Sequence, residues 1–379
     1  MPIFDQGYQH WSGTLSGHAW SGLAIARHGM RVGNKNRYVR MLILISWLPA
    51  LGLAVALCLW GLLEQRSSLI ASWMNVLSGF INAEMLRDPR GYRVEYWTIC
   101  YDYFLLIEMR CSLILVLLIG PSLISQDLRF NALPLYFSRP LRRIDYFLGK
   151  LGIIVAFIGM VTIVPSLIAY VLGLLFSLDL TIIKDTFGLL LSSIAYGLVI
   201  AVSSGMLMLA LSSLSRNSRY VGLFWLGIWI ISSMTAAILN GVDQSQRMHE
   251  SYAAQNAAMN QGAAPGRPGP PGARPGPRAV RGWNPEEFFT RELEASKTNW
   301  RPLVSYTENL SRVGRQLLGT NACWEKLGEK QPPGMREMFL YTFMGAQYPW
   351  YWSAGVLLGL FGLSACILNF RIKSLDRLR

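Results

Sequence analysis

The side chains of this sequence that could carry out chemistry are few and scattered. Four histidines, His10, His18, His28 and His249, form no H-E-x-x-H motif and no pair at metal-ligand spacing. The sequence also lacks G-x-S-x-G and G-x-x-x-x-G-K-[ST], the motifs of an elbow serine hydrolase and a P-loop ATPase. We therefore expect no catalytic, metal or cofactor site in this chain. Any ATP that it uses must be bound by another chain.

Two ionisable residues, Glu108 and Arg110, lie inside an apolar run. Charged groups within hydrocarbon are costly and for that reason often functional. They lie about five to seven residues from the expected outer end of their helix, roughly 10 Å deep, where long side chains still reach the headgroups. Both a substrate path and an interfacial anchor remain open for this pair.

Charges of both signs surround an apolar stripe in the segment 124–150. The stripe consists of Leu128, Leu133, Leu135 and Phe137. The charged residues are Asp127, Arg129, Arg139, Arg142, Arg143, Asp145 and Lys150. A loop that faces only water needs no such stripe, so we interpret the segment as a docking element. The alternative is a basic loop held against anionic lipid headgroups.

The elements that position these residues are predicted to be membrane helices. Of the 379 residues, 52% are hydrophobic and 15% charged, and the mean hydropathy is +0.31, which is unusual for a water-soluble domain. A helix needs about 20 mostly apolar residues to cross a bilayer. Six stretches satisfy this length, and they are 41–63, 103–125, 149–176, 186–213, 220–240 and 350–370. The expected fold is an all-α integral membrane protein with six transmembrane helices.

The placement of Lys and Arg predicts the orientation. Sixteen of them lie in 1–40, 126–150, 214–219 and the tail, against five in 64–102 and 177–185. By the positive-inside rule the first set is cytoplasmic, which places both termini in the cytoplasm of a multi-pass protein of the cell inner membrane. The net charge of +13 is accounted for by this topology, and we expect no nucleic-acid partner.

The remaining segments suggest a division of the chain. Residues 1–40 are predicted to carry an interfacial amphipathic helix at 11–31, and 41–240 hold the first five crossings. The large extracytoplasmic loop 241–348 divides into a Pro/Gly-rich linker, 262–282, and a partly helical part, 283–348. Residues 349–379 supply the sixth crossing and a basic tail. The segment 67–86 is expected to form an outer-surface helix, and a disulfide between Cys100 and Cys323 stays open.

The segment after the second helix resembles a known family signature. The run S-R-P-L-R-R-x-D-Y-x-x-G-K, residues 138–150, follows an acidic residue, and this is similar to the membrane subunits of type-2 ATP-binding-cassette transporters. The resemblance implies a loop, 126–148, that meets the ATPase subunit. It assigns corresponding roles to Asp127, Ser138, Arg139, Pro140, Arg143, Gly149 and Lys150. The sequence departs from the pattern at Asn131-Ala132, where many members have Gly-Thr, and in its enlarged outer loop.

Two hypotheses follow, and they belong to different classes. In the first, the chain is a permease that pairs with a second copy or a related permease and with cytoplasmic ABC ATPase subunits, which carry the ATP and Mg²⁺. In the second, it is a non-transporting anchor or assembly subunit, whose region 241–348 binds an extracytoplasmic protein. A membrane-embedded enzyme is disfavoured because no catalytic constellation is present. The sequence identifies neither the substrate nor the direction of transport nor the pairing state.

Overall fold

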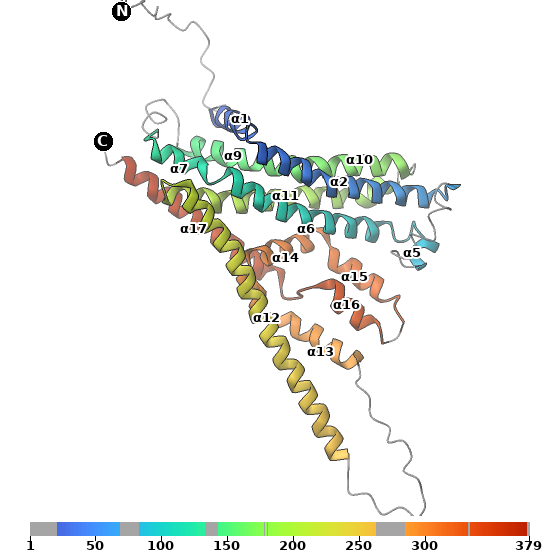
Figure 1. Cartoon of the computed structure of the whole chain (residues 1–379). Coiled ribbons are helices and arrows are strands. Elements are labelled where there is room, and N and C mark those ends of the chain that lie inside the picture. The colour runs from blue at the N-terminus through green and yellow to red at the C-terminus, as the bar shows by residue number, and fades with distance from the viewer. Residues whose placement is uncertain are drawn as a thin grey trace, which may run out of the picture.

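The computed structural model describes residues 21–68, 83–132, 143–177, 179, 181–262, 285–332 and 334–376. Within these ranges every regular element is a helix. The long helices are α2 (Arg37–Glu64), α6 (Arg93–Ile119), α9 (Arg143–Val161), α10 (Ile163–Ser177), α11 (Thr181–Leu214), α12 (Ser218–Gly262) and α17 (Trp350–Asp376). Figure 1 shows α2, α6, α9 with α10, and α11 running alongside one another as a bundle.

Six helices in the described part of the chain are long and apolar enough to cross a membrane. They span 37–64, 93–129, 144–177, 181–214, 218–253 and 350–371, so the predicted number of long apolar helices is confirmed. Two of the six are interrupted without losing their direction. Gly120 and Pro121 separate α6 from α7 (Ser122–Arg129), and Thr162 separates α9 from α10.

Short helices distinguish the two ends of the bundle. At one end, which we call the α7 end, α7 lies close to α1 (Ser21–Gly33). At the other, the α5 end, α5 (Ala83–Arg87) precedes α6. The predicted amphipathic helix at 11–31 is described only from residue 21. There α1 exposes Arg27 and Arg31 and buries Ala26. Of the predicted outer helix 67–86, residues 69–82 lie outside the described ranges, as do residues 263–284, which hold nearly all of the expected linker.

A buried ion cluster explains why α6 begins at Arg93 and not at residue 103 as expected. The Arg93 guanidinium lies 2.7 Å from Glu64 Oε2 of α2, 3.0 Å from Asp179 Oδ2 and 3.4 Å from Asp185 Oδ2 of α11. Because these carboxylates satisfy its charge, the helix continues ten residues beyond the apolar run. The cluster joins α2, α6 and α11 at the α5 end.

The chain after α12 returns into the bundle. It forms α13 (Pro285–Thr298), a 3₁₀ turn η2 (Arg301–Val304), α14 (Tyr306–Leu318), α15 (Thr320–Gly328) and α16 (Arg336–Met344). At the start of α14 the Tyr306 hydroxyl lies 3.0 Å from that of Ser203 of α11, and its ring meets Trp225 of α12 edge-on. The Trp225 indole N–H in turn donates to the carbonyl of Leu113 in α6. These partners lie well inside their helices, so α14 begins deep within the bundle.

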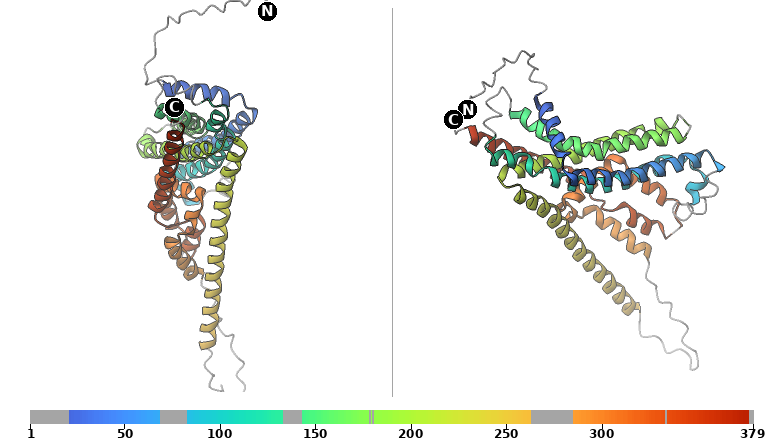
Figure 2. Two further views of the ribbon diagram at one scale, coloured as in Figure 1. Left: turned by 90° about the vertical axis from the view of Figure 1, so that its left-hand side faces the viewer. Right: turned by 45° about the horizontal axis from the view of Figure 1, so that its top comes forward.

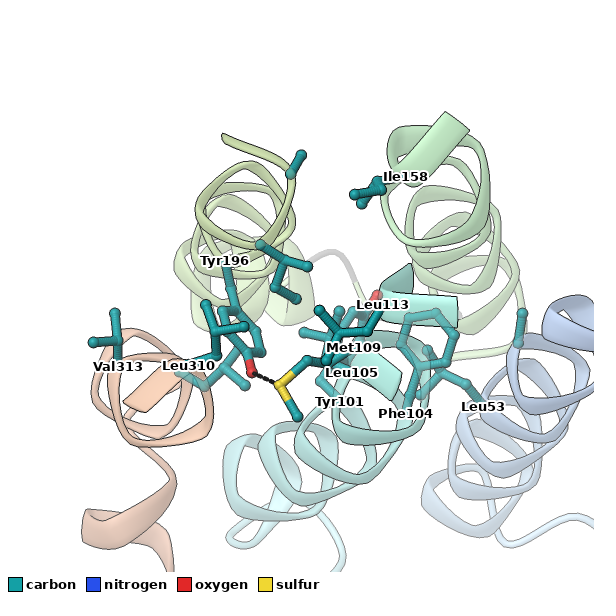
Figure 3. Packing of buried hydrophobic residues seen from close by; sticks show 14 of the residues in the cluster. Leu53, Tyr101, Phe104, Leu105, Met109, Leu113, Ile158, Tyr196, Leu310 and Val313 are labelled. Carbon is teal, nitrogen blue, oxygen red and sulfur yellow. Dashed lines mark hydrogen bonds between the residues drawn. The ribbon is translucent and has the colours of Figure 1, made fainter. Parts of the chain in front are cut away.

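From that deep start α14 and α15 run back toward the α5 end. Arg315 faces Asp102 of α6 at 3.8 Å, and Lys326 Nζ lies 2.5 Å from Glu95 Oε1 near the beginning of α6. The ring of Tyr196 of α11 lies against Gly314, where a side chain would find no room. Figure 3 shows the resulting core, in which Leu310 and Val313 of α14 lie beside Tyr196, Leu105 and Met109.

The thiols of the chain are unpaired. All five cysteines are free, including Cys100 and Cys323, the pair for which a disulfide had stayed open. Burial raises the pKa of the Cys323 thiol to about 11, so it is protonated at neutral pH. Among the described residues no group of His, Cys, Asp and Glu could hold a metal ion.

Candidate functional site

A buried junction at the α7 end brings together residues of the predicted docking segment. Lys150 Nζ of α9 lies 2.8 Å from Asp127 Oδ2 of α7, and the Tyr146 hydroxyl donates to the same oxygen at 2.6 Å. The side chains of Lys150 and Asp127 are only 10% and 15% exposed. Charge-assisted hydrogen bonds of this kind are short and strong, since solvent does not compete with them. The junction therefore fixes α7 to the beginning of α9.

Glycines couple the same stretch of α9 to α1. A Cβ at Gly149 would lie 2.9 Å from the Gly22 carbonyl oxygen and 2.8 Å from Ile25 Cβ, both on α1. A Cβ at Gly22 would lie 3.1 Å from the Asp145 carbonyl oxygen. The two backbones thus approach so closely that either side chain would separate them. The backbones of α9 and α1 are therefore in close contact.

A cavity of about 600 Å³ adjoins this junction, between α1, α2, α6, α7 and α9. The residues that line it include the apolar Val39, Ile119 and Ile153, and also Asp127 and Lys150. The ion pair thus borders this cavity.

The remaining residues of the docking segment are only partly placed. Arg129 ends α7 and is exposed, with its guanidinium 5.6 Å from the Phe130 ring centroid. Asp145 lies in the first turn of α9, whose first residue is Arg143. Ser138, Arg139, Pro140 and Arg142 lie outside the described residues. The structure therefore brings Asp127, Gly149 and Lys150 together and leaves the S-R-P turn undescribed.

Glu108 and Arg110 occupy different sides of α6. Glu108 is completely buried, and neither of its carboxylate oxygens has a hydrogen-bond partner among the described residues. Arg110 is exposed, because two residues turn a helix by about 200°. Between them Met109 accepts a hydrogen bond from the hydroxyl of Tyr196, which lies at the middle of α11 (Figure 3). The pair is therefore at mid-depth of the bundle and not near its end.

A match to a known family model identifies the family of this chain. The model of the family described as ABC-2 family transporter protein matches residues 105–307, more than half of the chain. The chain belongs to the ABC-2 transporter family. It is a multi-pass membrane protein and a permease subunit of an ABC transporter. No curated protein matches this sequence. The matched range contains both the Asp127 junction and the Glu108–Arg110 turn.

One departure from the common ABC-2 pattern has a structural reason. Asn131, where many members have glycine, adopts a φ of 50° directly after α7. Glycine enters this left-handed region freely, and asparagine is among the few other residues that tolerate it. The backbone turn that follows α7 is therefore compatible with the substitution.

Two contacts of this ABC-2 permease were not predicted from the sequence. Tyr146 supplies half of the contacts to Asp127, and its spacing of four from Lys150, which puts both on one helix face, was the available signal. The deep start of α14 had no signal in the chain, because Ser305 and Tyr306 follow a short 3₁₀ turn, Arg301–Val304, whose residue types do not indicate its depth.

Proposed function

We propose that this protein moves a substrate across the cytoplasmic membrane as one of two permease copies, driven by ATP that a separate cytoplasmic ATPase hydrolyses. The family implies an ATP-binding partner. The α7 end carries the basic segments 126–150 and 214–219, so in this proposal it faces the cytoplasm. ATP and Mg²⁺ are bound by the partner.

The observation that carries the proposal is the double junction at the start of α9. A push on the segment 126–148 reaches α9 through the ion pair of Asp127 and Lys150. It reaches α1 through the close backbone contact of Gly149 and Gly22. Such a push does work only if the two states of the permease bind nucleotide or substrate with different affinity.

Glu108 and Arg110 are the residues that we place on or beside the substrate path. An arginine exposed to lipid at mid-membrane costs about 3 kcal/mol or more. A face of α6 that exposes Arg110 is therefore better explained by an aqueous path or a second subunit than by lipid. In this proposal Glu108, buried on the opposite side, supports the path from within the bundle.

The test is to purify the full chain under mild conditions and measure whether an ATPase co-migrates. Arg139→Glu and Arg143→Glu should then abolish co-migration and permease-dependent ATP hydrolysis without changing the thermal midpoint of the permease. Arg219→Glu is the matched control, because it reverses an exposed charge at the same end of the bundle but outside the segment. Absence of a co-migrating ATPase, or equal loss in all three variants, contradicts the mechanism.

The anchor hypothesis retains one supporting observation, the continuation of α12 to Gly262 together with the four α-helices between α12 and α17, α13 to α16. Deleting 283–348 is no clean test, because Tyr306 and Leu310 belong to the bundle core. Charge reversal at exposed residues of α13, such as Glu286 and Glu287, is more selective. Loss of a bound extracytoplasmic protein with unchanged ATP hydrolysis would favour the anchor.

A further inference from the structure

The cavity between α1 and the bundle is lined differently at its mouth and in its depth. The exposed members of its lining include three polar residues, His28, Asn36 and Gln126. The buried members include three apolar residues that are at most 6% exposed, Val39, Ile119 and Ile153. A volume of about 600 Å³ is in the range of small-molecule sites. The cavity therefore suits a ligand with a polar head and an apolar tail.

Basic residues gather around the mouth of the cavity, and no acidic residue accompanies them in the chain. The stretch 21–63 contains no Asp or Glu. Its exposed basic residues, none of which forms an ion pair with a described residue, are Arg27, Arg31, Lys35, Arg37 and Arg40. Arg31 is a surface neighbour of His28, three residues before it on α1, and Lys35 directly precedes Asn36. The mouth therefore attracts an anionic group.

The position of α1 matches the boundary between lipid headgroups and acyl chains. Figure 2 (left), which views the molecule from the α7 end, shows α1 crosswise to the bundle helices and at their edge. The buried lining residues belong to the candidate spans 37–64, 93–129 and 144–177. An amphipathic helix in this position lies at the boundary of headgroups and acyl chains. In the proposed orientation the cavity therefore opens where a phospholipid presents both an anionic phosphate and an apolar chain.

Water or a soluble anion would fill this cavity less well than an amphiphile. A buried water needs several polar partners, and the apolar lining residues provide none. The polar groups beside them are already engaged, since Lys150 pairs with Asp127 at 2.8 Å and the Ser122 hydroxyl donates to the Ile119 carbonyl at 3.1 Å. A free phosphate would bind at the mouth and leave the apolar lining uncovered. An acyl chain covers that lining.

We propose that this cavity binds one anionic phospholipid of the cytoplasmic leaflet, with its phosphate among the basic residues of the mouth and an acyl chain against Val39, Ile119 and Ile153. Asp127 and Lys150 also line the cavity, so the bound lipid borders the junction that fixes α7 to α9. The proposal rests on the proposed function only for the orientation that places the α7 end in the cytoplasm.

Lipid binding to the purified full-length protein tests the proposal. After delipidation in detergent, native mass spectrometry measures the retention of phosphatidylglycerol and of phosphatidylcholine, chosen with the same acyl chains but different net charge. We expect a single phosphatidylglycerol to be retained where phosphatidylcholine is lost. Glycerol phosphate, a soluble anion without acyl chains, should not displace it. No retained lipid, equal retention of both lipids, or displacement by glycerol phosphate would each overturn the proposal.

Two adjacent residues of α1 give a matched pair of variants for the apolar part of the site. Ala24 lines the cavity and Leu23 does not, although both are exposed. Ala24→Trp should fill the cavity and abolish retention, whereas Leu23→Trp should retain phosphatidylglycerol as the unsubstituted protein does. Thermal unfolding without added lipid shows whether both variants are folded. Equal retention in the two variants contradicts the placement of the acyl chain.

A second pair of variants tests the mouth by charge. Arg31→Gln with Lys35→Gln removes two cations beside the mouth, while Arg216→Gln with Arg219→Gln removes two exposed cations elsewhere at the α7 end. Because each basic residue near an anionic lipid surface strengthens binding, the first pair should weaken phosphatidylglycerol binding by about tenfold or more. The control pair should leave it unchanged. Equal weakening by both pairs would assign the preference to overall charge and overturn the site.

Lipid retention is measured without ATP or an ATPase, so the site and the transport function fail separately. A protein that retains its lipid but has no co-migrating ATPase contradicts the transport function and leaves the site standing. A protein with a co-migrating ATPase and no retained lipid contradicts the site alone.

Discussion

At the scale of single residues, Asp127 is the point where the docking segment and the membrane helices meet. One carboxylate oxygen receives both the Lys150 ammonium and the Tyr146 hydroxyl. Removing one partner of a shielded charge costs more than the pair contributes, because the other charge stays buried. We therefore expect that replacing Lys150 or Tyr146 destabilises the junction, as replacing Asp127 itself would.

We predict that Lys150→Met lowers the stability of the permease by about 1–3 kcal/mol and that Tyr146→Phe lowers it by about 1 kcal/mol. Lys150→Met should also abolish ATPase stimulation, since α7 then moves without α9. Thermal unfolding in detergent and ATP hydrolysis with the partner measure the two effects. An unchanged midpoint in Lys150→Met would show that the ion pair does not hold the helices together.

Gly149 has a steric role that a single methyl group reveals. Gly149→Ala should separate α1 from α9, since its Cβ meets Ile25 and the Gly22 carbonyl below 3.0 Å. The expected outcome is a lower midpoint and faster proteolysis of α1. Gly188→Ala in α11 is the control, because nothing lies within 4 Å of its Cβ, and alanine there should be neutral or slightly stabilising.

Glu108 lowers the stability of the fold, and we attribute its presence to function. A buried carboxylic group without hydrogen bonds is unfavourable by about 1–3 kcal/mol. We predict that Glu108→Met raises the thermal midpoint but reduces transport-coupled ATP hydrolysis. A variant that is stabilised and fully active would remove Glu108 from the mechanism.

At the scale of elements, the Arg93 cluster holds the α5 ends of three helices. Arg93→Met leaves Glu64, whose side chain is 2% exposed, without its cation, and we predict a loss of about 3–5 kcal/mol. Adding Glu64→Met should restore most of the stability, because a packed apolar pair can replace a buried ion pair. Thermal unfolding of both variants measures this. No recovery in the double variant would mean that the lost stability comes from Asp179 and Asp185, which also pair with Arg93, and not from Glu64.

At the scale of the whole molecule, the region between α12 and α17 is part of the bundle. Gly314 lies against the ring of Tyr196, so we predict that Gly314→Leu expels α14 and makes Tyr306 accessible. The measurement is maleimide labelling of Tyr306→Cys with and without Gly314→Leu. Trp300→Cys, at a position 56% exposed, gives the rate for a free site. Equal labelling of Tyr306→Cys in both backgrounds would contradict a deep position of α14.

The sequence by itself determined the number of helices able to cross a membrane, because backbone hydrogen bonding in hydrocarbon requires long apolar helices and their length is visible in composition. It also placed Asp127, Gly149 and Lys150 in one functional segment through their resemblance to the ABC-2 pattern. These properties are local in the chain. They depend on residue types within a single helix or loop.

Only the tertiary structure decided which of these residues touch and where the polar residues near the helix ends belong. Arg93 extended α6 because its carboxylates come from α2 and α11, and Ser305 and Tyr306 entered the bundle because their partners lie on α11 and α12. Glu108 and Arg110 lie at mid-depth and not near the helix end as expected, because the packing of α6 against α11 sets their depth. Such contacts join residues far apart in the chain, and composition and periodicity do not record them.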